Sequence, residues 1–241
     1  MRIHSIETLG THDGPGIRLV IFLQGCHFRC LYCHNPDTQD MNGGREVSID
    51  ELEAQILRQR EYFGPNGGVT ASGGEPTLQS RELAELFSRL KQHGIHTTLD
   101  TNGHMMSDDV RKLLDVTDLV LLDVKHIDDT AHIHLTGISN INTLKMLHYL
   151  ESIQKKTWLR YVLVPGYTDN PEDLEAFGQK LGHYTCIERV QILPYHTLGI
   201  SKYAELHRPY LLDGVPVPTL ESVTKAQEIF EKYFSKVTIG G

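Results

Sequence analysis

Short apolar segments alternate with amphipathic segments along most of this 241-residue chain. The apolar segments predict six strands, at residues 18–23, 69–72, 96–99, 119–122, 158–164 and 189–193. The amphipathic segments predict helices at 48–62, 80–93, 107–115, 141–154 and 219–234, and another that begins at Asn170-Pro171. Strands that are apolar on both faces are typical of parallel sheets covered by helices. Residues 1–8 and 236–239 are predicted to add edge strands.

Nearly every predicted strand ends in a polar or glycine-rich cluster. These clusters are QGC at 24–26, SGGEP at 72–76, DTNG at 100–103, DVK at 123–125, PGYTD at 165–169 and PYH at 194–196. In a parallel β/α fold these ends share one face, which is where barrel active sites form. About six β-α units are too few for an eight-stranded barrel. We therefore predict an α/β fold, a partial (β/α)6 open barrel, with residues 1–241 as a single domain.

Charge and hydropathy exclude some classes of function. The formal net charge is −8, which argues against broad nucleic-acid binding. No apolar run approaches the roughly 18 residues of a membrane span. The N-terminus has no apolar core of a secretory signal, so a cytoplasmic location is expected. In the cytoplasm, closely spaced cysteines indicate metal or redox chemistry more than disulfides.

Three cysteines lie within the stretch CHFRCLYCHN, at positions 26, 30 and 33. The CLYCH segment is compatible with covalent c-type haem, but the absence of an export signal weakens that interpretation. A zinc site of Cys26, Cys30, Cys33 and His34 stays open, although structural zinc ligands usually come in two separated pairs. Three thiolates in one loop at a strand end favour an iron–sulfur cluster with one iron left open to another ligand.

Other strand ends supply further candidates. The two glycines of SGGE allow a ligand to approach the backbone closely, and Glu75 adds a charge beside them. Asp123 and Lys125 follow a buried strand, where they form either a structural ion pair or part of a ligand site. Asp100, Thr101 and Asp123 could hold a hard cation through oxygen atoms. His196 follows the last predicted parallel strand.

The spacing C-x-x-x-C-x-x-C and the later GGE segment resemble the radical S-adenosylmethionine (radical SAM) enzymes. The resemblance extends along nearly the whole chain and is strongest to the glycyl-radical activases that act on pyruvate formate-lyase. The segments that carry it, in order, are RIHSIETLGTHDGPGIRLVIFLQGC, YCHNPDT, GGVTASGGEP, GIHTTLDTNG, LVLLDVK, RYVLVPGYTD and LPYHTLG.

The resemblance implies a role for each matched residue. Ligands of a [4Fe–4S] cluster would be Cys26, Cys30 and Cys33. S-adenosylmethionine contacts would be Tyr32, Cys33, His34, Gly74, Asp123, Val124, Lys125 and His196. A Na⁺ or K⁺ site would use Asp100, Thr101, Asp123 and the carbonyl of Leu121, a position where the family has Met. Contacts to the partner's glycine loop would be Asp13, His34 and Arg160.

The implied reaction needs no acid–base pair from the protein. A reduced cluster would cleave S-adenosylmethionine to methionine and a 5′-deoxyadenosyl radical, which takes hydrogen from a glycine Cα. The implied partners are pyruvate formate-lyase and a flavodoxin or ferredoxin electron donor, with the chain a monomer that binds neither nucleic acid nor membrane. Only Cys186 lies outside the motif, which favours an activase without a second cluster. Activation of another glycyl-radical enzyme, small-molecule radical chemistry and a non-catalytic zinc module are the alternatives.

Overall fold

The computed structural model describes residues 1–240, which divide into two compact units. The first unit comprises Met1–His27 and Thr38–Leu121, and the second comprises Phe28–Asp37 and the chain from Leu122 onward. The chain first passes between the units inside the cysteine-rich loop. It passes again within strand β6 (Leu119–Asp123). The single domain over 1–241 stays a prediction.

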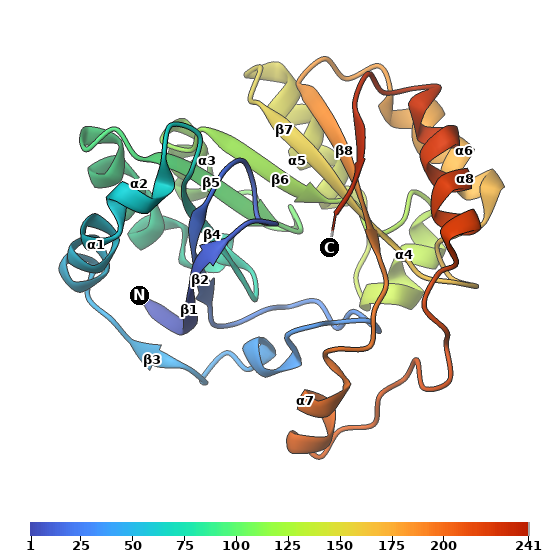
Figure 1. The fold of residues 1–241 in the computed structure, drawn as a ribbon, viewed down its shortest axis with the longest axis horizontal. Helices are drawn as coiled ribbons and strands as arrows, with labels where there is room; N and C mark the ends of the chain where they lie inside the picture. Colours follow the sequence, from blue (N-terminus) through green and yellow to red (C-terminus); the bar gives the residue numbers. More distant parts are fainter. Residues whose placement is uncertain (241) are drawn as a thin grey trace. The chain divides into compact units, whose positions relative to one another are not determined.

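A sheet forms the centre of the first unit (Figure 1). Its hydrogen-bonded order is β3 (Arg45–Glu46), β1 (Arg2–Gly10), β2 (Arg18–Leu23), β4 (Gly68–Gly73) and β5 (His96–Thr101). β2, β4 and β5 are parallel, whereas β1 and β3 are antiparallel to their neighbours. The predicted strand at 1–8 is thus confirmed, but β3 lies outside it, so β1 is not the edge.

Helices of the first unit begin where the sequence supplies caps. They are α1 (Ile49–Arg58), α2 (Ser80–Gln92) and α3 (Asp108–Asp115), with 3-10 turns η2 (Arg60–Phe63) and η3 (Pro76–Gln79). A further 3-10 turn, η1 (Pro36–Gln39), begins in the second unit and ends in the first. Ser48 and Ser107 each accept a backbone hydrogen bond at the start of α1 and α3. The predicted helix at 48–62 ends earlier, at Arg58, and its last residues form η2 instead.

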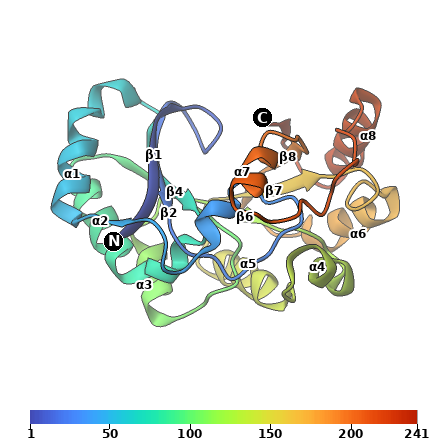
Figure 2. The same cartoon turned by 90° about the horizontal axis from the view of Figure 1, so that it is seen from below.

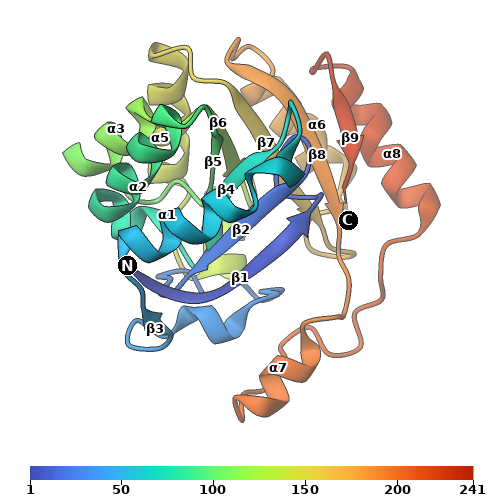
Figure 3. The ribbon, with the colours of Figure 1, turned by 60° about the vertical axis from the view of Figure 1, so that its left-hand side comes forward.

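The second unit contains the parallel strands β7 (Thr157–Leu163), β8 (Ile187–Pro194) and β9 (Val237–Ile239), with β8 in the middle (Figure 3). Its longer helices are α5 (Ile141–Ser152), α6 (Pro171–Leu181) and α8 (Leu220–Glu231). Tyr161 of β7 packs edge-on against Phe177 of α6 and Phe230 of α8, at ring distances of 5.1 and 5.4 Å. This aromatic contact buries the helices on the strands.

Two short helices of the second unit were not predicted. They are α4 (Asp129–Thr136) and α7 (Ile200–Glu205), both visible in Figure 2. α4 has a local signal, because Asp128 caps its first turn and Gly137 ends it with a φ of 80°. Its residues do not repeat at a helical period, so tertiary contacts stabilise it more than pattern does.

Candidate functional site

In the first unit, the ends of the parallel strands bring the SGGE segment next to the residue that precedes Cys26. The register pairs Leu23 with Gly73, so both strands end at the same level. The amide of Glu75 donates to the carbonyl of Gly25 at 2.7 Å, and the amide of Gly25 donates to Thr38 at 2.8 Å. The start of the cysteine loop is therefore held by backbone hydrogen bonds to the strand end of β4.

Glu75 faces the protein interior and does not project toward a ligand. It is 2% exposed, and its carboxylate accepts hydrogen bonds from Thr77 and from the Thr101 hydroxyl and the Asn102 amide, the last two at 2.6 and 2.9 Å. Burial raises the pKa of Glu75, and these hydrogen bonds oppose the rise without cancelling it. The Glu75 carboxylate, predicted to add a charge beside the glycines, thus links the turn after β4 to the turn after β5. Only the backbone of the glycines remains available at this edge to contact a ligand.

Asp100 and Asp13 are both held by neighbouring strands of this unit. The Ser72 hydroxyl donates to Asp100 Oδ2 at 2.6 Å. The Thr70 hydroxyl donates to the backbone carbonyl of Asp13 at 2.6 Å, and it accepts from the buried Arg18 Nε at 2.6 Å. The loop that carries Asp13 is therefore tied to the sheet at its base, and Asp100 is oriented by the strand end of β4.

We expect Gly74→Ala to destabilise the first unit, because a Cβ at this position would meet the carbonyl oxygen of Gly25. The expected cost is about 1–3 kcal/mol in the free energy of unfolding, the range for forced overpacking. Gly94→Ala is the matched control: its φ is +67°, but nothing lies within 4 Å, so it reports backbone strain alone. Urea unfolding monitored by circular dichroism measures both. A cost close to zero for Gly74→Ala would show that the Gly25 contact is unimportant.

In the second unit, Tyr32 of the cysteine loop lies beside the charged pair at the end of β6. Lys125 Nζ is 2.8 Å from Asp123 Oδ2 and 5.8 Å from the centre of the Tyr32 ring. Burial opposes the charge on Lys125, but the Asp123 carboxylate outweighs it and holds the pKa of Lys125 above its usual range. Burial also raises the pKa of Tyr32 well above 10. Lys125 is thus a charged side chain that Asp123 holds in place beside Tyr32 of the cysteine loop.

His34 and His196 meet edge-on, with ring centres 4.4 Å apart. The pKa of His34 is lowered mainly by burial and, to a smaller extent, by the neighbouring His196. Arg160 of β7 accepts a hydrogen bond from the amide of Val124 through its backbone carbonyl, at 3.2 Å. The structure therefore brings together the predicted residues of the second unit in two pairs and one triad: His34 with His196, Val124 with Arg160, and Tyr32 with Asp123 and Lys125.

The cysteines and the predicted cation ligands are divided between the units. Cys26, Asp100, Thr101 and Leu121 belong to the first unit, and Cys30, Cys33 and Asp123 to the second. None of the four cysteines, all within residues 1–240, forms a disulfide. No set of three or more His, Cys, Asp or Glu side chains in the described chain is arranged to hold a metal ion. No helix in residues 1–240 has the length and apolar character of a membrane span.

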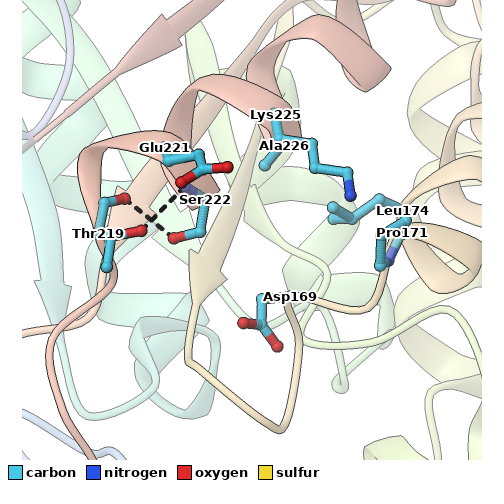
Figure 4. Close-up of a pocket in the computed structure, with 8 residues that line it drawn as sticks. All are labelled: Asp169, Pro171, Leu174, Thr219, Glu221, Ser222, Lys225 and Ala226. Atoms are coloured by element: carbon cyan, nitrogen blue, oxygen red, sulfur yellow. Dashed lines mark hydrogen bonds between the residues drawn. The ribbon is translucent and has the colours of Figure 1, made fainter.

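A cavity of about 240 Å³ lies in the second unit where α6 and α8 begin (Figure 4). Its wall mixes the carboxylates of Asp169 and Glu221 with the Lys225 ammonium and the apolar Leu174. None of the predicted site residues lines it. The first turn of α6 is capped by the Asn170 side chain, and the first turn of α8 is capped by the Thr219 side chain. The cavity is therefore separate from the predicted chemistry.

Comparisons with known proteins identify the family to which this fold and this cysteine motif belong. Residues 20–178 match the family described as the radical SAM superfamily. A domain of pyruvate-formate lyase-activating enzyme from Bacteroides vulgatus superposes with a TM-score of 0.62 at 27% identity, covering 73% of this chain and 99% of that one. Streptococcus suis SuiB bound to its precursor peptide SuiA gives a TM-score of 0.72 at 18% identity over 93% of this chain and 49% of that one, which shows the fold alone. The fold is that of the radical SAM enzymes, and the predicted partial (β/α)6 open barrel is confirmed as the fold class.

Relatives with higher identity narrow the class. The pyruvate formate-lyase 1-activating enzyme of Escherichia coli K12 is 44% identical over 239 residues, 98% of this chain and 97% of the relative. The pyruvate formate-lyase-activating enzyme of Staphylococcus epidermidis is 46% identical over 232 residues, 93% of this chain and 92% of the relative. The chain belongs to the family of pyruvate formate-lyase-activating enzymes within the radical SAM superfamily.

Proposed function

We propose that this protein activates pyruvate formate-lyase by generating a glycyl radical on it. The observation that carries the proposal is the identity of 44–46% with activating enzymes of that name over at least 92% of both chains. The matched region of this chain contains both the cysteine motif and the GGE segment. The class of substrate is therefore a large protein that presents a glycine.

We infer that Cys26, Cys30 and Cys33 hold a [4Fe–4S] cluster, and the donor set fits this group. Three thiols lie within eight residues and none is in a disulfide. Fe–S clusters prefer thiolate ligands, and three of them leave one iron open. When bound, the cluster and S-adenosylmethionine supply the radical chemistry that removes a hydrogen atom from a glycine Cα.

We further infer that S-adenosylmethionine is held by Gly74 in the first unit and by seven residues of the second, Tyr32, Cys33, His34, Asp123, Val124, Lys125 and His196. The fit has two supports. Gly74 lies in the turn after β4 and, because it has no side chain, packs closely against the backbone of Gly25. The buried Tyr32 hydroxyl has no hydrogen-bond partner within residues 1–240. Lys125 is positioned by Asp123 and supplies a cation, and Tyr32 packs with the apolar Leu135, Val164 and Leu212, which keep water out.

The remaining assignments follow the family pattern and are part of the proposal. A Na⁺ or K⁺ ion is held by Asp100, Thr101, Asp123 and the carbonyl of Leu121, all oxygen donors. Asp13, His34 and Arg160 contact the glycine loop of pyruvate formate-lyase. A flavodoxin or ferredoxin donates the electron, and the activase acts as a monomer.

The test is anaerobic incubation of the iron-loaded protein with S-adenosylmethionine, a strong reductant and purified pyruvate formate-lyase. We expect 5′-deoxyadenosine and the glycyl radical signal in electron paramagnetic resonance (EPR) to appear together. A pyruvate formate-lyase variant with alanine at the radical-bearing glycine is the matched control, and it should give no glycyl radical.

Other outcomes distinguish the alternatives. Formation of 5′-deoxyadenosine without a glycyl radical on pyruvate formate-lyase would mean that the cofactor chemistry is right and the substrate is another glycyl-radical enzyme or a small molecule. Anaerobically purified protein that contains zinc and no iron would contradict the cluster itself.

A further inference from the structure

Part of the cysteine loop, residues 28–37, belongs to the second unit and is held there at two places. The first is the end of α4. The amides of Arg29 and Leu31 donate to the carbonyls of Thr136 and Leu135 at 2.8 and 2.9 Å. Phe28 packs edge-on against the buried His132 of the same helix, at a ring distance of 5.7 Å. α4 therefore fixes the backbone on both sides of Cys30.

The second place is α7, which holds the loop from Cys33 onward. The Tyr203 hydroxyl donates to the carbonyl of Cys33 at 3.1 Å. Lys202 Nζ donates to Asn35 Oδ1 at 2.8 Å and lies 3.2 Å from Asp37 Oδ2. Gly199 lies against His34 so closely that a Cβ there would come within 3.0 Å of the ring. Contacts from Gly199, Lys202 and Tyr203 thus join α7 and its N-cap residue to residues 33–37.

The ring of Tyr203 is itself fixed by its neighbours. It is 5% exposed and packs edge-on against Tyr210 at 4.9 Å, and the Tyr210 hydroxyl is 2.6 Å from that of the buried Tyr195. The rest of the α7 segment is open to solvent, with Leu198 76% and Leu211 65% exposed. α7 is therefore a short helix on an exposed segment, and its Tyr203 contacts Tyr210, Arg208 and the cysteine loop.

We propose that Lys202 and Tyr203 are positioning residues, and that α7 is a clasp that fixes Cys33 and the residues after it within the loop that binds the cluster. The proposal deepens the proposed function and rests on it for the identity of the group that Cys33 binds. α4 fixes the loop around Cys30 independently. The clasp therefore acts on the third cysteine and on His34, and its loss should leave the backbone at Leu31 undisturbed.

Two substitutions open the clasp with little change in packing. Tyr203→Phe removes the hydroxyl and keeps the ring, and its matched control is Tyr233→Phe, which removes a hydroxyl that donates to Glu175 of α6 in the same unit. Lys202→Met removes the charge and keeps an unbranched side chain, and Lys202→Arg should restore the contact. Lys156→Met is the control for a lost lysine, because Lys156 pairs with Glu188 at 3.4 Å just before β7.

Amide hydrogen exchange on the anaerobic full-length protein is the first readout, because it needs no activity. The amide of Cys33 donates to Cys30 in the turn that Tyr203 holds. In Tyr203→Phe and Lys202→Met its exchange should be about fivefold faster, the effect of losing one hydrogen bond. The Leu31 amide, bonded to α4, should exchange at the wild-type rate. Both controls and Lys202→Arg should match the wild type.

The rate at which the loaded protein releases iron to a chelator is the second readout, recorded with the EPR spectrum of the reduced cluster. We expect release to be about fivefold faster in the two clasp variants, with an altered EPR line shape. Exchange and iron release equal to those of Tyr233→Phe and Lys156→Met would overturn the clasp even if wild-type protein makes the glycyl radical. Faster exchange at Cys33 with no glycyl radical in the wild type would support the clasp and contradict the proposed function.

Discussion

Replacement of Cys30 by alanine is expected to abolish both cleavage of S-adenosylmethionine and formation of the glycyl radical. Cys26, Cys30 and Cys33 are the thiols of one loop, and loss of one leaves too few ligands to hold a cluster with a single open iron. The backbone at Cys30 is held by hydrogen bonds from Arg29 and Leu31 to α4, so the loop should keep its path in the variant. Iron content, 5′-deoxyadenosine and the EPR signal measure the result.

Cys186→Ala is the matched control for the loss of a thiol. Cys186 is buried in the second unit and lies outside the motif, and its amide donates to Glu151 at 2.8 Å through the backbone, which alanine keeps. We expect full iron content and full radical yield, with a stability cost of about 1 kcal/mol from lost packing. Radical formation by Cys30→Ala at the wild-type level would contradict the assignment of the loop as the cluster site.

Replacement of Glu75 by alanine is expected to destabilise the protein by about 3–5 kcal/mol, the cost of leaving buried partners of a charged group unsatisfied. The variant leaves the Thr101 hydroxyl and the amides of Thr77 and Asn102 without their acceptor. Glu75→Gln should cost less, because Oε1 of the glutamine can still accept hydrogen bonds from Thr77 and Thr101. Only the bond from the Asn102 amide is lost, since the new NH2 group would face it. Urea unfolding of the iron-free protein measures both, and Glu61→Ala, an exposed glutamate of the same unit, should be nearly neutral.

The pH dependence of stability tests the burial of Glu75 directly. Burial raises its pKa above the usual 4.5, so the folded protein binds this proton more tightly than the unfolded chain. The contribution of Glu75 is therefore present in full below pH 4.5 and declines as the pH rises through the folded pKa. The free energy of unfolding of the wild type, relative to Glu75→Gln, should fall over that range. A difference that stays constant or rises with pH would contradict the raised pKa.

Much of the fold could be predicted because its signals are local. Apolar strands, the caps at Ser48, Ser107 and Asn170 and the glycine after α2 each depend on neighbours within a few residues, and all lie in elements that the structure contains. The cysteine spacing is also local, since all three thiols lie on one loop. α4 was missed because its apolar residues do not repeat at a helical period, and α7 was missed because it has only six residues. The helix at 48–62 was predicted too long because η2 continues the chain in a tighter turn.

Most of the strands and longer helices, the cysteine loop and the strand-end clusters follow from the residues alone, because period, capping and spacing act over short distances. Only the tertiary structure shows that Glu75 points inward to Thr101, that Lys125 pairs with Asp123 beside Tyr32, and that Lys202 and Tyr203 hold the residues after Cys33. These contacts join residues up to 170 positions apart. The packing of distant segments decides which polar partner a buried group meets. A pattern of neighbouring residues in the sequence cannot predict that partner.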